Sequence, residues 1–165
     1  MNQQPTEFKA LLERIETAKR SSGADLSADE DLSLAVMNLV SLEEHFYFTA
    51  MRTGDDHYFD LLDEVRAQRK ALLARLVDRH EGESWCASKH LLATTMRLIE
   101  VGTKLRASDK AEANAMFERA YRMYTMFWAL RLKLVDTNGL RSEAAKEKPW
   151  TMQDIVNRLV NCCDE

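Results

Sequence analysis

The chain has 165 residues, of which 45% are hydrophobic and 30% are charged, and its formal net charge is −4. This length fits a single domain with a sizeable core, and the composition is that of a folded globular protein. Lysine and arginine are scattered among aspartate and glutamate, so no basic face predicts a nucleic-acid partner. No run of about 18 apolar residues occurs, and a membrane span is therefore not expected.

The cysteines and the N-terminal residues bear on the cellular compartment. Cys86, Cys162 and Cys163 are odd in number and two of them are neighbours, which does not fit a disulfide framework. Residues 1–5 lack the apolar run of a secretory signal peptide. We therefore expect a cytoplasmic protein in a reducing environment.

Hydrophobic periodicity and turn residues predict six helices. Only five glycines and two prolines interrupt the chain, which favours long helices over a sheet with many turns. Ser27 to Glu30 has the form of a capping box, and Gly54 stops the same helix. The pair Ser108–Asp109 caps a later helix. The predicted helices cover about residues 5–20, 27–53, 55–80, 83–107, 109–138 and 151–162.

The four central helices are each about 25 residues long, and short turns between them force antiparallel neighbours. The predicted fold class is therefore all-α. We expect an up-down-up-down four-helix bundle over about residues 27–138, with an additional N-terminal helix and a short C-terminal helix packed on its outside. No second domain is evident, so residues 1–165 are expected to form one domain.

The stretch that contains Gly102, Ala113, Phe117 and Ala120 resembles the signature of a tetratricopeptide helical hairpin. The resemblance covers about 35 residues once, whereas repeat proteins stack about three units to bury their faces. It therefore indicates a closely packed pair of helices and not a repeat array.

Two charged residues interrupt apolar helix faces. Glu43 falls in the middle of the apolar face of residues 27–53, and Arg69 does the same in residues 55–80. A buried charge without a partner is very costly, so the two should form an ion pair. The pair can be purely structural, or it can line a polar ligand cavity together with Thr95 and Tyr124.

Arg131 also lies inside an apolar stripe, near the end of the fifth predicted helix. Its long side chain can reach water from there. The alternative is an ion pair with Glu83 or Asp78 near the start of the fourth helix.

A metal site is a further hypothesis. His80, Cys86 and His90 surround the turn between the third and fourth helices, and Cys86 and His90 share a helical face as zinc ligands often do. The helical wheel turns that face away from the core, which equally fits a surface thiol and a surface histidine. No Glu-x-x-His of the ferritin-like di-iron proteins occurs. We expect no cofactor, with zinc as the alternative.

The fifth helix carries an unusually wide stripe of aromatic and methionine side chains. Such a stripe is most simply core, but its width indicates contact on two sides, with the C-terminal helix or with another subunit as the second contact. The residues expected on the interaction surface are Met116, Met123, Phe127 and Trp128.

These patterns predict a helical-bundle protein that acts by binding another protein, as a homo-oligomer or adaptor, without catalysis of its own. The alternatives are a ligand-binding protein or enzyme that uses the layer around Glu43 and Arg69, and a metalloprotein that uses His80, Cys86 and His90. No phosphate-binding glycine loop, nucleophile elbow or Cys-x-x-Cys motif occurs in the sequence.

Overall fold

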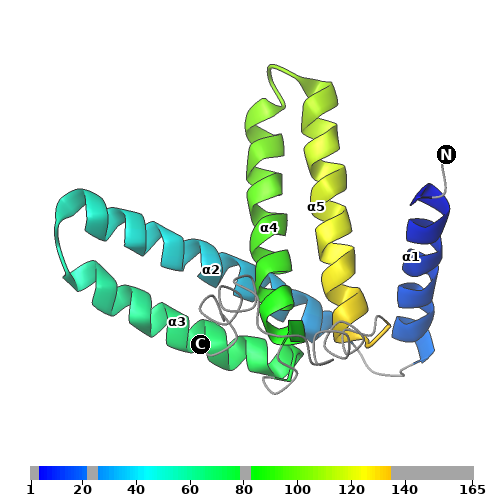
Figure 1. Cartoon of the computed structure of the whole chain (residues 1–165), viewed down its shortest axis with the longest axis horizontal. Coiled ribbons are helices and arrows are strands. Elements are labelled where there is room, and N and C mark those ends of the chain that lie inside the picture. Colours follow the sequence, from blue (N-terminus) through cyan, green and yellow to red (C-terminus); the bar gives the residue numbers. More distant parts are fainter. Residues whose placement is uncertain (1–3, 22–25, 79–82, 135–165) are drawn as a thin grey trace, which may run out of the picture.

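The computed structural model describes residues 4–21, 26–78 and 83–134, and in these ranges it contains five helices and no strand. The prediction of an all-α helical bundle is confirmed. The predicted C-terminal helix, residues 151–162, lies outside the described residues. The helices are α1 (Gln4–Ser21), α2 (Ser27–Thr53), α3 (His57–Leu76), α4 (Glu83–Leu105) and α5 (Lys110–Arg131) (Figure 1).

Local chemistry sets several of the helix ends. Gly54 ends α2 in the left-handed region, with φ of 69°, and its amide donates to the carbonyl of Ala50. The carboxylate of Asp109 accepts hydrogen bonds from the amides of Ala111 and Glu112 and so caps α5. Both ends were predicted from the sequence, and both are confirmed.

The start of α2 differs from the capping box expected at Ser27 to Glu30. The N-cap residue is Leu26, whose side chain makes no capping hydrogen bond. The carboxylate of Glu30 forms an ion pair with Lys19 of α1. The Glu30 carboxylate, which in a capping box would bind a backbone amide of its own helix, thus binds Lys19 of α1.

Two helices end earlier than the sequence predicts. Helix α3 ends at Leu76, and Val77 is already extended, with φ of −136° and ψ of 134°. Both residues are buried in the core, so tertiary packing ends this helix where no glycine or proline does. Helix α5 ends at Arg131 instead of near residue 138, and Lys133 follows with a positive φ of 54°.

The helices form two antiparallel hairpins, α2 with α3 and α4 with α5. Figure 1 shows the α2/α3 hairpin extending to the left while the α4/α5 hairpin stands upright. The two hairpins meet through α2 and α4 and then diverge. The outer part of the α2/α3 hairpin is therefore not covered by α4 or α5.

The hydrophobic core lies where the hairpins meet. Its largest members are Trp85 of α4 and Phe127 and Trp128 of α5, each at most 3% exposed. Val36 of α2 and Leu73 of α3 complete it from the other hairpin and are fully buried. The core thus holds the two hairpins together near their shared end, and their tips project from it.

A close approach joins α4 to α5. A Cβ atom placed on Gly102 would lie 2.6 Å from Cε1 of Phe117, a distance that real Cβ atoms do not reach. Gly102 thus lets the phenyl ring of Phe117 lie against the backbone of α4. This is the close helix packing that the tetratricopeptide-like spacing indicates, within a single hairpin.

Helix α1 lies beside α5 (Figure 1). The rings of Phe8 and Tyr121 meet edge to face with centroids 6.3 Å apart, and the ammonium of Lys19 lies 4.7 Å from the ring centre of Trp128. A guanidinium nitrogen of Arg14 donates to the carbonyl of Leu134 at 3.1 Å. The N-terminal helix therefore packs on the outside of the α4/α5 hairpin.

Candidate interaction surface

The ion pair expected between Glu43 and Arg69 is present between α2 and α3. Nε of Arg69 donates to Oε1 of Glu43 at 2.6 Å, and Nε of Arg66 donates to Oε2 at 3.1 Å. Arg69 is 1% exposed and Glu43 is 8% exposed. Since both oxygens of Glu43 already accept guanidinium hydrogen bonds, this geometry favours a structural link between the two helices.

The other polar residues proposed for this layer make different contacts. The hydroxyl of Thr95 donates to the carbonyl of Leu91 in its own helix at 2.8 Å. The hydroxyl of Tyr124 lies 2.7 Å from Oγ of Ser33, near the start of α2. The ligand cavity built from these residues stays a prediction.

Arg131 pairs with Asp29, a residue that was not expected from the sequence. Its Nη2 donates to Oδ2 of Asp29 at 2.9 Å, which ties the end of α5 to the start of α2. Both side chains are about a quarter exposed. Asp29 thus takes the place of Glu83 and Asp78, the alternative partners proposed from the sequence, because the end of α5 faces the start of α2.

The proposed metal ligands do not share one environment. Cys86 is buried, at 3% exposed, whereas His90 is exposed; His80 lies outside the described residues. The expectation that Cys86 faces solvent is therefore wrong: the start of α4 sits where the two hairpins meet, and Ser84, Trp85 and Ser88 are buried there too. No group of three metal-binding side chains occurs in the described part of the chain, and the zinc hypothesis stays a prediction.

The predicted interaction surface on α5 needs correction. Phe127 is fully buried and Trp128 is 3% exposed, so both belong to the core and cannot present a surface. Met116 and Met123 are half-buried. The second contact inferred from the wide stripe is provided in part by α1, which places Lys19 over Trp128.

A surface of apolar side chains lies instead on α2. Phe48 is 67% exposed, Met51 63% and Tyr47 46%, and the rings of Tyr47 and Phe48 meet edge to face at 5.2 Å. We call these three residues the aromatic face. They lie in the C-terminal half of α2.

The aromatic face continues the side of α2 that is buried nearer its start. At 3.6 residues per turn, positions 11 or 18 apart point in nearly the same direction. Tyr47 therefore points from the helix axis in nearly the same direction as Val36. The same holds for Phe48 and Met37, and for Met51 and Ser33. The earlier residue of each pair is buried, at 3% or less exposed, and the later one is exposed because the hairpins have diverged.

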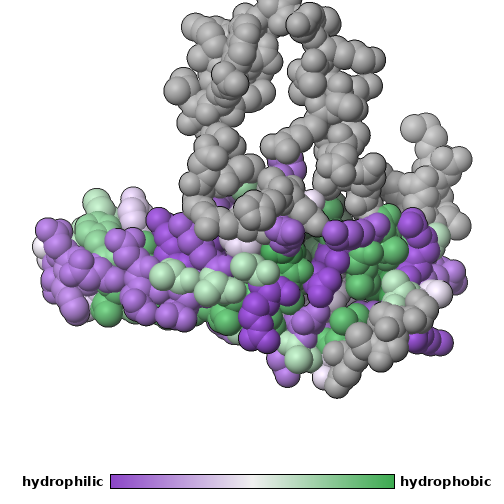
Figure 2. All heavy atoms as spheres, turned by 90° about the horizontal axis from the view of Figure 1, so that it is seen from below, coloured by the Kyte–Doolittle hydropathy of each residue, from purple (hydrophilic) through white to green (hydrophobic). Residues whose placement is uncertain are grey.

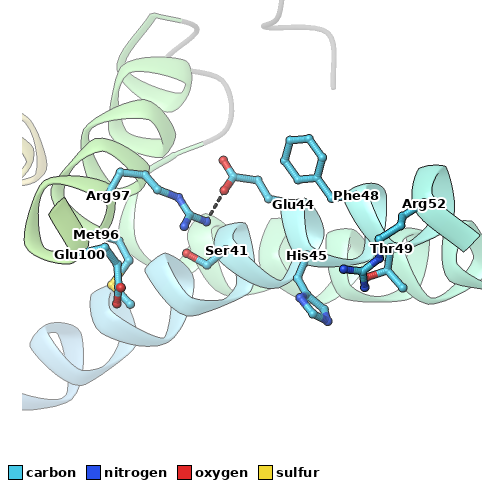
Figure 3. A pocket seen from close by; sticks show the side chains of 9 residues that line it. All are labelled: Ser41, Glu44, His45, Phe48, Thr49, Arg52, Met96, Arg97 and Glu100. Carbon is cyan, nitrogen blue, oxygen red and sulfur yellow. Dashed lines mark hydrogen bonds and ion pairs between the residues drawn. The ribbon is translucent and has the colours of Figure 1, made fainter. Parts of the chain in front are cut away.

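A groove lies beside the aromatic face where α2 and α4 diverge, with a volume of about 620 Å³. In Figure 3, Arg97 reaches from α4 toward Glu44 on α2 and forms an ion pair with it, and Phe48 projects from α2 on the same side as Glu44. Arg52 and Glu100 lie at opposite ends. The lining residues are Ser41, Glu44, His45, Phe48, Thr49, Arg52, Met96, Arg97 and Glu100.

The lining argues against a small-molecule pocket. Such pockets are enclosed and have only a few polar groups, whereas this groove is open to solvent and carries two carboxylates, two guanidinium groups and an imidazole. On the face seen in Figure 2, hydrophobic patches are likewise small and separated by hydrophilic residues.

A sequence signal for the aromatic face exists in residues 46–48, where three aromatic residues follow one another. Consecutive helical residues point about 100° apart, so three of them span more than half of the helix surface. The ring centroid of Phe46 lies 6.2 Å from that of Tyr58 on α3. Tyr47 and Phe48 therefore point away from this contact. The aromatic run therefore predicts a second contact of α2.

Comparisons with known proteins identify no relative: no protein-family model, no curated protein and no solved structure matches the chain. None of the described helices is long and apolar enough to cross a membrane.

Proposed function

We propose that this protein acts by binding another protein surface through α2, as an oligomer or adaptor, without catalysis of its own. The observation that supports the proposal is the aromatic face of Tyr47, Phe48 and Met51, which continues a buried stripe into solvent. Exposed aromatic and methionine side chains on a rigid helix are the residue types enriched in the centres of protein interfaces. We place this activity in the cytoplasm, because the cysteine content fits a reducing compartment.

Site-specific photo-cross-linking in cells tests this proposal. A benzophenone amino acid that replaces Phe48 should trap a discrete product, whether with a second copy or with another protein. The same replacement at Met126 serves as the matched control, because Met126 is 47% exposed on α5 and lies outside the groove. No discrete product from position 48, or the same products from both positions, would refute the proposal.

A further inference from the structure

We infer that the partner on the aromatic face is a second copy of this chain, related to the first by a twofold axis. The inference rests on the proposed function, since it names the partner of the same surface. In a twofold contact, one patch meets an identical patch, so each patch must complement itself in shape and in charge. The surface between α2 and α4 meets both conditions.

The shape condition is met by a projection beside a hollow. Phe48 stands out from α2 with two thirds of its surface exposed, and the groove next to it is open. In a twofold contact, Phe48 of each copy enters the groove of the other, beside Met96. This symmetric arrangement buries both phenyl rings away from water.

The charge condition is met by the two ends of the groove. Glu44 and Arg97 pair with each other across the middle. Arg52 at the α2 end and Glu100 at the α4 end form no ion pair within residues 4–21, 26–78 and 83–134. A twofold axis through the groove brings Arg52 of one copy to Glu100 of the other, twice, so the charges that one copy leaves unmatched complement each other.

This charge pattern also favours a second copy over a peptide of predominantly one charge sign. An acidic or basic peptide would require a groove of predominantly one sign, whereas two carboxylates and two guanidinium groups balance here. The patch is smaller than the 20–30 residues a side of a standard interface, since nine residues line the groove. We therefore expect a dimer that dissociates in roughly the micromolar range.

Sedimentation of the purified full chain, across concentrations from about 1 to 200 μM around that range, tests the inference. We expect a monomer–dimer equilibrium, and Phe48→Asp should raise the dissociation constant about thirtyfold or more, the effect of losing a central interface residue. Met126→Asp, at an exposed site on a different helix, should leave it unchanged. Circular dichroism of each variant establishes that the helices remain folded.

A charge exchange gives the sharper test, because it does not depend on removing a large side chain. Arg52→Glu and Glu100→Arg should each weaken the dimer, while the double variant should restore it, since the two charges meet only across the dimer axis. A monomeric wild type at about 200 μM, or no recovery in the double variant, would overturn the inference. The proposed function would still stand if cross-linking at position 48 trapped a different protein.

Discussion

Glu43 and Arg69 form a short, nearly solvent-free ion pair between the two helices of one hairpin, with 2.6 Å between Oε1 and Nε. Glu44, the next residue, forms an ion pair with Arg97 at the surface. The side chain of Arg69 is 2% exposed, whereas those of Glu44 and Arg97 are each more than 40% exposed. Two adjacent glutamates thus both form ion pairs with arginine, one buried and the other exposed to solvent.

This difference predicts unequal effects of two matched substitutions. Glu43→Ala removes the carboxylate that neutralises a buried guanidinium, and we expect the free energy of unfolding to fall by about 3–5 kcal/mol. Glu44→Ala breaks a solvated pair and should cost less than about 1 kcal/mol. Urea denaturation of both variants measures the two losses, and equal losses would contradict the buried placement of Glu43.

Gly102 should resist replacement although it lies inside a helix. Alanine would gain roughly 1 kcal/mol of helix propensity, but its methyl group would meet the ring of Phe117. Overpacking of this kind costs about 1–3 kcal/mol, so we expect Gly102→Ala to destabilise the protein. In a double-mutant cycle with Phe117→Leu, the two losses should not add, because the smaller side chain relieves the clash. A stabilising Gly102→Ala would mean that α4 and α5 are further apart.

The cap of α5 allows a conservative test of local structure. Asp109→Ala removes the acceptor of two backbone amides and should lower the free energy of unfolding by about 1 kcal/mol. Asp109→Asn keeps an acceptor oxygen at the same position and should retain most of that stability. Thermal denaturation compares the three proteins, and indistinguishable alanine and asparagine variants would argue against capping by this side chain.

Burial of Cys86 predicts a protected thiol. With Cys162 and Cys163 replaced by serine, Cys86 should react with a thiol reagent only when the structure opens locally. An opening free energy of about 3 kcal/mol would slow labelling roughly a hundredfold relative to the denatured chain. A cysteine that replaces the exposed His90, one turn away, should label rapidly when Cys86 is also replaced by serine. Equal rates at both positions would contradict the packing at the start of α4.

The sequence by itself determined those features that depend on neighbours in the chain. Gly54 ends α2 because its left-handed backbone suits glycine, and Asp109 caps α5 because its carboxylate reaches amides two and three residues ahead. The ion pair of Glu43 and Arg69 was also predictable, since a short turn fixes which residues of a hairpin lie at the same height. Helical periodicity then shows that both charges point inward.

Only the tertiary structure decided how the two hairpins cross, because a crossing direction depends on side chains from both helices at once and on no single stretch of sequence. That crossing buries Val36 and exposes Tyr47, although both point to the same side of α2. It also buries Cys86 on a side of α4 that its periodicity assigns to solvent. The aromatic face and the groove beside it both follow from where one hairpin stops covering the other.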